Sequence, residues 1–452
     1  MYLNIFHSDC LEFLDTKKIN ADEKSRIQTL SLGLVIPDKF MTLCENDDDL
    51  CMFYPHTIYK KYGKHLDDLD MNEMYDKLII DPDVKFKKIK AREMLKQISI
   101  TQFESGYPYL VFIDNANKSH QLQRLGRIKI SNLCTEIFQL QTTSKINDYG
   151  EDDVVGYDIS CNLGSLNIVN LMEQNEFEFT VENAIRSLTS VSNLSNIKNA
   201  PGISKANVDF HSVGLGVMNL HGYLTKVNIP YESDKAIELT DALFTCINYY
   251  SIKASNKMAQ ELNATFKYFE KSTYATGEYF NRYYDKEFEF KDEKVKELFK
   301  DIKLPTIQDW KDLASVVKES GLYHSYRMAI APTQSISYIQ NSTASIQPIV
   351  NQVETRVYGN STTYYPMPFM RRDNLLLYKS AYVMDQKKVI DLFATAQKHV
   401  DQGISLVLFV TNEYTTKDLA HYYYYAWSKG IKSIYYVRTK NLNIEECETC
   451  SV

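Results

Sequence analysis

The sequence has no long apolar run, although 44% of its 452 residues are hydrophobic. No window approaches the roughly 18 uninterrupted apolar residues that a membrane-spanning helix needs. The first residues, MYLNIFHSDCLEF, also lack the basic start and the apolar core of a secretory signal. We therefore expect no membrane partner and a location in the bacterial cytosol. A phage origin of the gene is an alternative.

The sequence also lacks an excess of either charge. Its 51 Lys and Arg residues are interspersed with 58 Asp and Glu residues, which gives a formal net charge of -7. A protein that binds nucleic acid broadly needs a basic surface that displaces counterions, so we expect no nucleic-acid partner. Proline, glycine and serine do not gather into a linker, and we find no internal repeat that would divide the chain.

Cysteines are few in the patterns that build disulfides or hold metal. Of eight cysteines only Cys447 and Cys450 lie close together, and no second pair or histidine lies near them, so we predict no bound metal. In a large cytosolic protein, cysteines are more often reduced, reactive or buried than joined in a disulfide framework. Four of them are interpreted as packing residues: Cys10, Cys44, Cys51 and Cys246.

Extended and helical patterns alternate from end to end of the chain. Extended patterns predict strands at 29–37, 107–114, 126–140, 158–169, 326–331, 404–410 and 431–438. Helical patterns predict helices at 85–105, 181–197, 209–226, 235–262, 294–299, 307–320, 386–402 and 416–429. Short apolar strands separated by helices favour an α/β fold with a mainly parallel sheet covered by helices.

The third predicted strand holds the most informative segment, Asn132-Leu133-Cys134-Thr135-Glu136. Side chains alternate between the two faces of a strand, so Asn132, Cys134 and Glu136 are expected on one face. There they would combine a hydrogen-bonding amide, a one-electron or nucleophilic sulfur and a general base. A half-buried strand whose small cysteine packs inward explains the same pattern. No histidine lies in this strand, which argues against cysteine-protease chemistry.

Nine segments, in one order along the chain, resemble the large catalytic subunit of the aerobic class I ribonucleotide reductases, of the class Ib branch. They are YLNIFHSDCLEFLDTKKINADEK (2–24), ESGYPYLVF (104–112), SNLCTEI (131–137), DISCNLGSLNIVN (158–170), SVGLGVMNLHGYL (212–224), APTQSISYI (331–339), YYPMPF (364–369), IKSIYYVR (431–438) and CETC (447–450).

The resemblance implies the C-terminal portion of a ten-stranded α/β barrel, built from two parallel five-stranded halves with the radical cysteine inside. In the family, the segment like 2–24 lies well inside the protein, so the barrel is expected to be incomplete in this chain. Open strands would then be exposed, and we expect a separate N-terminal fragment of the large subunit to cover them. Residues 1–440 are expected to form the catalytic barrel portion and 441–452 a mobile C-terminal redox tail.

The resemblance also assigns roles within the segment 132–136. Cys134 resembles the radical cysteine that takes a hydrogen atom from the ribose of a ribonucleoside diphosphate. Glu136 resembles the base that removes the 3′-hydroxyl proton, and Asn132 a hydrogen-bonding partner of the ribose hydroxyls. With Leu133 and Thr135 they are expected to bind the substrate.

A second substrate-binding element is implied after the predicted strand at 326–331. In the family this turn holds the substrate diphosphate, and hydroxyls with free backbone N–H groups do form anion sites. A Ser- and Thr-rich turn is also a common helix cap, so the pattern alone is weak. The residues of the turn are Pro332, Thr333, Gln334, Ser335, Ile336 and Ser337.

Three further cysteines resemble the redox cysteines of the family. Cys161 resembles one of two thiols that deliver two electrons to the substrate and end as a disulfide, and its partner has no equivalent in this chain. Cys447 and Cys450 are expected to re-reduce it by thiol–disulfide exchange. An external dithiol, thioredoxin or a glutaredoxin-like protein, would then reduce them. A metal-scavenging tail is the alternative.

Tyr435 and Tyr436 resemble the adjacent tyrosines that pass a radical equivalent to the active site. The radical would come from a separate small subunit with a dimetal-tyrosyl centre and travel from Tyr436 to Tyr435 to Cys134. This chain itself is expected to bind no cofactor. Because the chain has 33 tyrosines, such a pair in a strand is otherwise ordinary packing.

Two patterns have competing interpretations. The helix predicted at 416–429 carries one apolar stripe, which is either a core face or, by resemblance, part of the region that receives the C-terminal tail of the small subunit. Gly214 and Gly216 open a run that fails the dinucleotide-binding motif at Asn219, so we assign them to close packing. The stripe consists of Leu419, Tyr422, Tyr423, Ala426 and Trp427.

These patterns predict a ribonucleoside-diphosphate reductase large subunit that is active only with its N-terminal fragment and the small subunit. One alternative is an inert remnant that only binds the small subunit or the missing fragment. Another is a stand-alone dithiol oxidoreductase that uses Cys447 and Cys450.

Overall fold

The computed structural model describes residues 1–440 except 20–23, 25, 28 and 196. These residues form two compact units. Unit 1 comprises Met1–Lys118, Ile128–Thr135 and the residues from Ser405 onward, and unit 2 comprises Ser119–Arg127 and Glu136–Ile404. Each unit therefore draws on segments that lie far apart in the sequence. No helix in the described part of the chain is long and apolar enough to cross a membrane.

Unit 1 is organised around a five-stranded sheet that contains strands from both ends of the described chain. All neighbouring strands are parallel except β5 and β11, which are antiparallel. β2 and β5 are buried along their whole length, as expected for short apolar strands covered on both faces. The strand order is β1 (Tyr2–Asn4), β2 (Gly33–Ile36), β5 (Tyr109–Phe112), β11 (Ser433–Lys440) and β10 (Leu406–Thr411). The sequence predicted the last four of these strands.

Helices pack around this sheet. α5 (Ala91–Ser105) packs against both β11 and α17 (Thr416–Ser428), and the Tyr423 hydroxyl of α17 donates a hydrogen bond to the Gln102 side chain of α5. The other elements of unit 1 are α1 (Cys10–Asp15), α2 (Asp38–Asn46), the antiparallel pair β3 (Asp49–Phe53) and β4 (Phe86–Lys90), α3 (Pro55–Tyr62), α4 (Met71–Ile80) and α6 (Ile113–Lys118).

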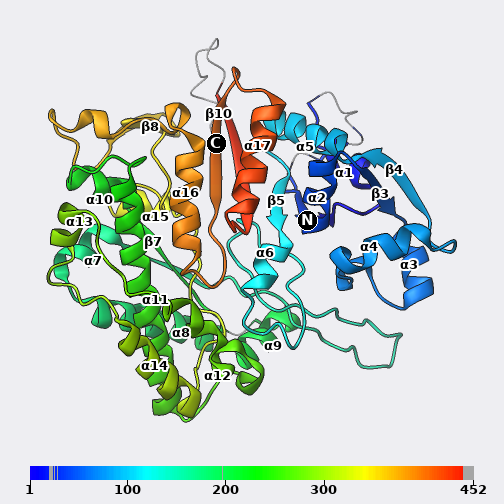
Figure 1. Cartoon of the computed structure of the whole chain (residues 1–452), viewed down its shortest axis with the longest axis horizontal. Helices are drawn as coiled ribbons and strands as arrows, with labels where there is room; N and C mark the ends of the chain where they lie inside the picture. The colour runs from blue at the N-terminus through cyan, green and yellow to red at the C-terminus, as the bar shows by residue number, and fades with distance from the viewer. Residues whose placement is uncertain (20–23, 25, 28, 196, 441–452) are drawn as a thin grey trace. The chain divides into compact units, whose positions relative to one another are not determined.

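Unit 2 places long helices around a short pair of parallel strands, β6 (Leu163–Asn167) and β7 (Gly214–Met218). The 29-residue helix α11 (Asp234–Leu262) packs against three helices that appear around it in Figure 1, namely α8 (Phe177–Leu194), α14 (Ile307–Ser320) and α16 (Gln386–Gln397). The other helices and strands of unit 2 are α7 (Ile168–Gln174), α9 (Pro201–Phe210), α10 (Leu220–Lys226), α12 (Thr273–Thr276), α13 (Glu293–Leu298), α15 (Gln334–Ile339), β8 (Val353–Tyr358) and β9 (Ser361–Pro366).

Several sequence predictions about unit 2 are wrong. The predicted strand at 326–331 makes only isolated bridges, from Met328 and Ile330. The predicted helix at 209–226 is instead β7 followed by α10. The short apolar run in β7 fits a buried strand as well as a helix, so periodicity could not decide between them. The glycines of β7 do pack closely, since a Cβ at Gly216 would lie 2.6 Å from the backbone oxygen of Ala329.

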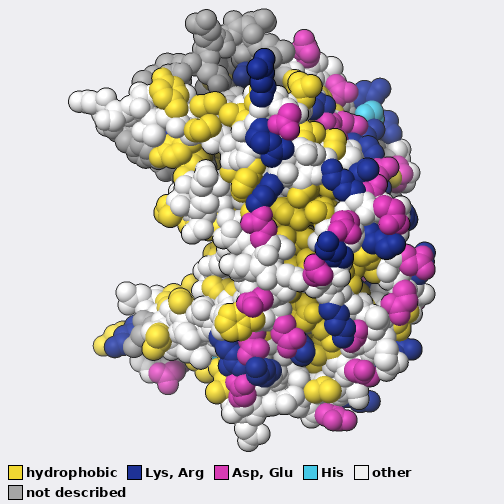
Figure 2. All heavy atoms as spheres, turned by 90° about the vertical axis from the view of Figure 1, so that its left-hand side faces the viewer, with side chains coloured by type: hydrophobic (Ala, Val, Ile, Leu, Met, Phe, Trp, Pro, Cys, Tyr) yellow, Lys and Arg dark blue, Asp and Glu magenta, His cyan; other side chains and the backbone are white. Residues whose placement is uncertain are grey.

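The fold is a mixed α/β arrangement that matches an incomplete barrel. In the described part of the chain no sheet joins its first strand to its last, and closure is what defines a barrel. On the face drawn in Figure 2, Lys and Arg side chains are interspersed with Asp and Glu and with hydrophobic side chains, as the balanced charge of the sequence suggested.

A buried ion pair anchors the segment that precedes the turn at 332–337. Arg327 and Asp401 have fully buried side chains whose Nη2 and Oδ2 atoms lie 3.4 Å apart. The two carboxylate oxygens of Asp401 also accept backbone N–H groups of Arg327 and Met328, at 2.9 and 2.8 Å. The carboxylate therefore holds both the guanidinium and the backbone of this segment.

We expect Asp401→Asn to lower the free energy of unfolding by about 3–5 kcal/mol, because it leaves a buried guanidinium without its counter-charge. Chemical denaturation followed by circular dichroism measures the change. Asp373→Asn is the matched control, since its 3.1 Å pair with Arg371 is exposed and should be worth less than about 1 kcal/mol. Equal effects of the two substitutions would contradict this assignment.

Candidate active site

The segment that holds the candidate radical cysteine is a turn and not the predicted strand. Thr135 has a left-handed backbone with φ of 62°, and its N–H donates to the Asn132 carbonyl at 3.4 Å. The prediction that Asn132, Cys134 and Glu136 share one face of a strand at 126–140 is therefore wrong, because side-chain alternation requires extended backbone. The segment also passes from unit 1 to unit 2 between Thr135 and Glu136.

Three hydroxyl groups of unit 1, all from residues far from this turn in the sequence, donate hydrogen bonds to its carbonyl oxygens. Tyr2 of β1 donates to the Asn132 carbonyl at 2.5 Å, and Ser405, just before β10, donates to the Cys134 carbonyl at 2.6 Å. Ser433, the first residue of β11, donates to the carbonyl of the next residue, Thr135, at 2.7 Å. Sequence patterns gave no sign of these three positioning residues, since their only link to the turn is the folded sheet.

Within unit 1 the turn presents Cys134 to the tyrosine pair of β11. The Cys134 thiol donates to the Tyr435 hydroxyl, with Sγ and Oη 3.7 Å apart, and the rings of Tyr435 and Tyr436 are 5.6 Å apart. Burial raises the pKa of Tyr435 and the thiol adds to that rise, while burial raises the pKa of Tyr436 to about 12. Both phenols are therefore protonated at neutral pH, so a proton must leave with any electron that they give up.

The other residues of the segment differ in exposure. Leu133 is 62% exposed, so its side chain is available for contact, whereas Thr135 is buried. Asn132 and Cys134 are half-buried. In unit 2, Glu136 is 1% exposed, and its carbonyl accepts the Gly403 N–H at 2.7 Å.

Cys161 is an exposed residue of unit 2 that lies two residues before β6. The predicted strand at 158–169 is thus shorter than expected, and Cys161 belongs to the irregular segment that leads into it. An exposed thiol is accessible to exchange with another dithiol. Cys447 and Cys450 lie outside the described residues.

The predicted diphosphate turn at 332–337 is only partly a turn: Pro332 and Thr333 precede the short helix α15, and the other four residues form its first part. Thr333 has a left-handed backbone with φ of 57°, and its hydroxyl lies 3.0 Å from that of Ser337 and accepts the Ser345 N–H at 2.7 Å. These two hydroxyls therefore stabilise the turn. The exposed residues are Gln334, Ser335 and Ile336.

The stripe on α17 is divided between core and surface. Leu419, Tyr423 and Ala426 are buried, which confirms the core interpretation for these three. Tyr422 and Trp427 are only half-buried. The Trp427 indole N–H is held by Asp38 at 2.7 Å.

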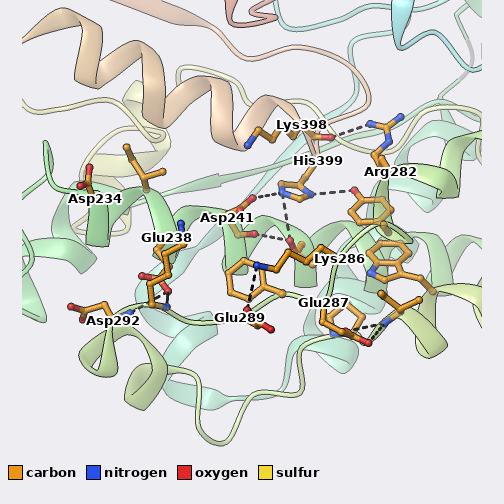
Figure 3. A pocket seen from close by; sticks show the side chains of 18 of the residues that line it. Asp234, Glu238, Asp241, Arg282, Lys286, Glu287, Glu289, Asp292, Lys398 and His399 are labelled. Atoms are coloured by element: carbon orange, nitrogen blue, oxygen red, sulfur yellow. Dashed lines mark hydrogen bonds and ion pairs between the residues drawn. The ribbon is translucent and has the colours of Figure 1, made fainter.

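A cavity of about 1200 Å³ in unit 2 is lined by none of the predicted site residues (Figure 3). Its inner wall carries His399, whose Nε2 lies 2.8 Å from Asp241 and whose Nδ1 lies 3.2 Å from the Tyr283 hydroxyl. Charged side chains around it pair with one another, as Lys235 does with Asp292 at 2.7 Å. The size of this cavity alone does not identify it as an active site.

Comparison with known proteins places the chain in a family. The model of the ribonucleotide reductase barrel domain matches residues 1–437, and the chain belongs to this family. Ribonucleoside-diphosphate reductase subunit alpha of Bacillus subtilis (strain 168) is 52% identical over 451 residues, covering 100% of this chain and 64% of that protein. The subunit of the same name from Mycoplasma pneumoniae is 43% identical over 470 residues, covering 100% and 65%. The chain thus spans just under two thirds of the length of these relatives.

Proposed function

We propose that the protein is the catalytic portion of a class Ib ribonucleoside-diphosphate reductase, which makes deoxyribonucleoside diphosphates by thiyl-radical chemistry. The observation that carries this proposal is the 3.7 Å contact between Cys134 Sγ and Tyr435 Oη, with Tyr436 beside it. A thiol that donates to a phenol oxygen can give its hydrogen atom to the phenoxyl radical of that tyrosine. The names of the relatives support the same reaction.

In the proposed reaction the Tyr435 phenoxyl radical takes the thiol hydrogen of Cys134, which restores the phenol and leaves a thiyl radical. The thiyl takes the hydrogen atom from C3′ of the ribose, Glu136 accepts the 3′-hydroxyl proton, and Asn132 hydrogen-bonds to the ribose hydroxyls. Water then leaves from C2′. Cys161 and a second thiol supply two electrons and two protons and form a disulfide, and the hydrogen atom of Cys134 returns to C3′.

The proposal requires partners that act on other residues of the chain. A small subunit with a dimetal-tyrosyl centre would deliver the radical to Tyr436, and the exposed start of α15 around Ser335 would bind the substrate diphosphate through hydroxyl and backbone N–H groups. Cys447 and Cys450 would carry electrons from thioredoxin or a glutaredoxin-like protein to Cys161. This chain would hold no cofactor itself.

We also propose that a separate polypeptide supplies the part of the large subunit that the relatives have beyond the aligned region. The purified 452-residue chain is then expected to reduce no ribonucleoside diphosphate with the small subunit alone. Addition of the N-terminal third of the Bacillus subtilis relative should restore deoxynucleotide formation, measured by chromatography. Turnover without any added fragment would refute the split arrangement, and binding of the fragment without turnover would favour an inert remnant.

The proposed redox roles make different forecasts for the cysteines. In the reconstituted enzyme, Cys161→Ser should abolish turnover with every reductant, because the thiol pair that supplies the two electrons to the substrate is then incomplete. Joint replacement of Cys447 and Cys450 by serine should block turnover with thioredoxin only, and a small dithiol that reaches Cys161 should still support it. Equal losses in both assays would contradict a shuttle role for the tail.

A further inference from the structure

Two more tyrosines lie against the pair in β11. Tyr109 is the first residue of β5, the antiparallel neighbour of β11, and Tyr107 lies two residues before this strand. The ring of Tyr109 is 4.9 Å from that of Tyr435, and the ring of Tyr107 is 5.4 Å from that of Tyr436. Tyr107 and Tyr109 are 5.2 Å apart. Each tyrosine of the proposed relay therefore has an aromatic partner in β5 or just before it.

The backbone before Tyr107 is shaped to the ring of Tyr436. Gly106 has a left-handed backbone with φ of 77°, and a Cβ built on it would lie only 2.4 Å from Cε1 of Tyr436. A residue with a side chain could not occupy this position without moving the ring. The Gly106–Tyr107 segment thus fixes one side of Tyr436.

Tyr107 also contacts two residues outside the tyrosine cluster, Ser31 and Lys17. Its hydroxyl lies 3.3 Å from the Ser31 hydroxyl, and the Lys17 ammonium lies 4.4 Å from the centre of its ring. Burial opposes ionisation of Tyr107, but hydrogen bonds with Ser31, Tyr109 and Tyr436 outweigh burial and lower its pKa. The contact with Tyr436, in which the Tyr436 hydroxyl is the donor, adds to the rise that burial causes in the pKa of Tyr436.

We propose that Tyr107 is a positioning residue whose hydroxyl and ring hold the Tyr436 phenol in the orientation from which hydrogen passes between Tyr436 and Tyr435. In that step the Tyr436 phenoxyl radical takes the hydroxyl hydrogen of Tyr435, so that Tyr436 becomes a phenol and Tyr435 the phenoxyl radical. Such a transfer depends steeply on the relative placement of the two oxygens. The proposal rests on the proposed function, because only a radical relay needs this orientation.

The first test measures the contact without any turnover. Position 436 is labelled with a fluorinated tyrosine, which ionises at lower pH than tyrosine, and its ionisation is followed by 19F NMR in the full chain. The Tyr436 hydroxyl donates to the Tyr107 oxygen, and this hydrogen bond favours the protonated form of residue 436. Tyr107→Phe should therefore lower the ionisation midpoint of the label by about 0.5–1 pH unit, the equivalent of one hydrogen bond. An unchanged midpoint would overturn the proposal.

The matched control is Tyr75→Phe. Tyr75 is also a buried tyrosine of unit 1, and its hydroxyl donates to the Asp49 carbonyl at 2.7 Å and accepts the Cys51 N–H at 2.9 Å. Tyr75→Phe therefore also removes a buried, hydrogen-bonded hydroxyl. The ring of Tyr75 does not contact Tyr435 or Tyr436. The midpoint of the label should stay where it is. A shift as large as that of Tyr107→Phe would mean a general loosening of unit 1 and would overturn the assignment.

The second test uses the reconstituted reductase. Tyr107→Phe should lower kcat about tenfold with KM for the ribonucleotide unchanged, because substrate binding does not involve this residue. Tyr75→Phe should leave kcat unchanged. A shifted midpoint with normal kcat would overturn the positioning role. An inactive wild-type reconstitution would count against the proposed function, and the NMR result would still decide whether Tyr107 holds Tyr436.

Discussion

Replacement of Cys134 by serine should abolish deoxynucleotide formation in the reconstituted enzyme while leaving the fold intact. The hydroxyl is slightly smaller than the thiol and can still donate to Tyr435, so unit 1 loses little packing. An alcohol O–H bond is much stronger than a thiol S–H bond, so the Tyr435 phenoxyl radical cannot take its hydrogen. We expect a loss on the order of 10³-fold or more in kcat.

Cys44→Ser is the matched control for this substitution. Cys44 is a buried cysteine of unit 1, and its thiol donates to the Ala91 carbonyl at 3.5 Å, a hydrogen bond that serine can keep. This variant should retain turnover. Substrate binding to Cys134→Ser, followed by equilibrium dialysis, should also persist. Appreciable turnover by Cys134→Ser would refute thiyl chemistry at this residue, since no other thiol could be expected to replace it.

The helices that were predicted well have signals that are local in sequence. α14 begins with a capping box in which Thr306 and Asp309 exchange hydrogen bonds, and α17 begins in the same way with Thr415 and Asp418. α11 begins after the capping residue Ser233. Such signals need no knowledge of the rest of the chain. The predicted boundaries of these three helices accordingly agree with the structure to within one residue.

The turn at Cys134 shows where local signals fail. Its left-handed Thr135 is uncommon for a β-branched residue, and the carbonyls of the turn are satisfied by hydroxyls from Tyr2, Ser405 and Ser433. Those partners lie some hundred to three hundred positions away, so an alternating pattern in the sequence could suggest only a strand. The tyrosine pair was identified by resemblance alone, and its contact with Cys134 spans 301 positions.

The same limit explains why Tyr107 and Tyr109 were missed. They stand in a segment that resembles the family, but nothing in the sequence marks two of 33 tyrosines as partners of Tyr435 and Tyr436. Their relation appears only when β5 pairs with β11. The sequence motifs thus identify the residues that carry the chemistry. The residues that surround them can be identified only from the pairing of strands in the folded protein.

The two interpretations of Tyr436, as a packing residue and as a radical carrier, predict opposite effects of Tyr436→Phe on turnover. The substitution removes one hydroxyl, worth about 1 kcal/mol of stability, and keeps the ring against Tyr107 and Gly106. If the residue only packs, turnover should survive. A relay needs an oxidisable phenol, which phenylalanine lacks, so we expect turnover to collapse by a factor on the order of 10³ or more, and Tyr435→Phe should behave in the same way. Deoxynucleotide formation, substrate binding and thermal unfolding are measured together.

Tyr62→Phe is the control for both tyrosine variants, because it removes the hydroxyl that donates to Asp81 at 2.7 Å on a different part of unit 1. It should lose no more than a small amount of stability and keep full turnover. The two relay variants should differ from it in turnover and not in unfolding temperature, which separates a lost electron pathway from a lost fold. Near-normal turnover by Tyr436→Phe or Tyr435→Phe would remove the reason to assign a radical relay to this chain, and with it the choice of class I chemistry for Cys134.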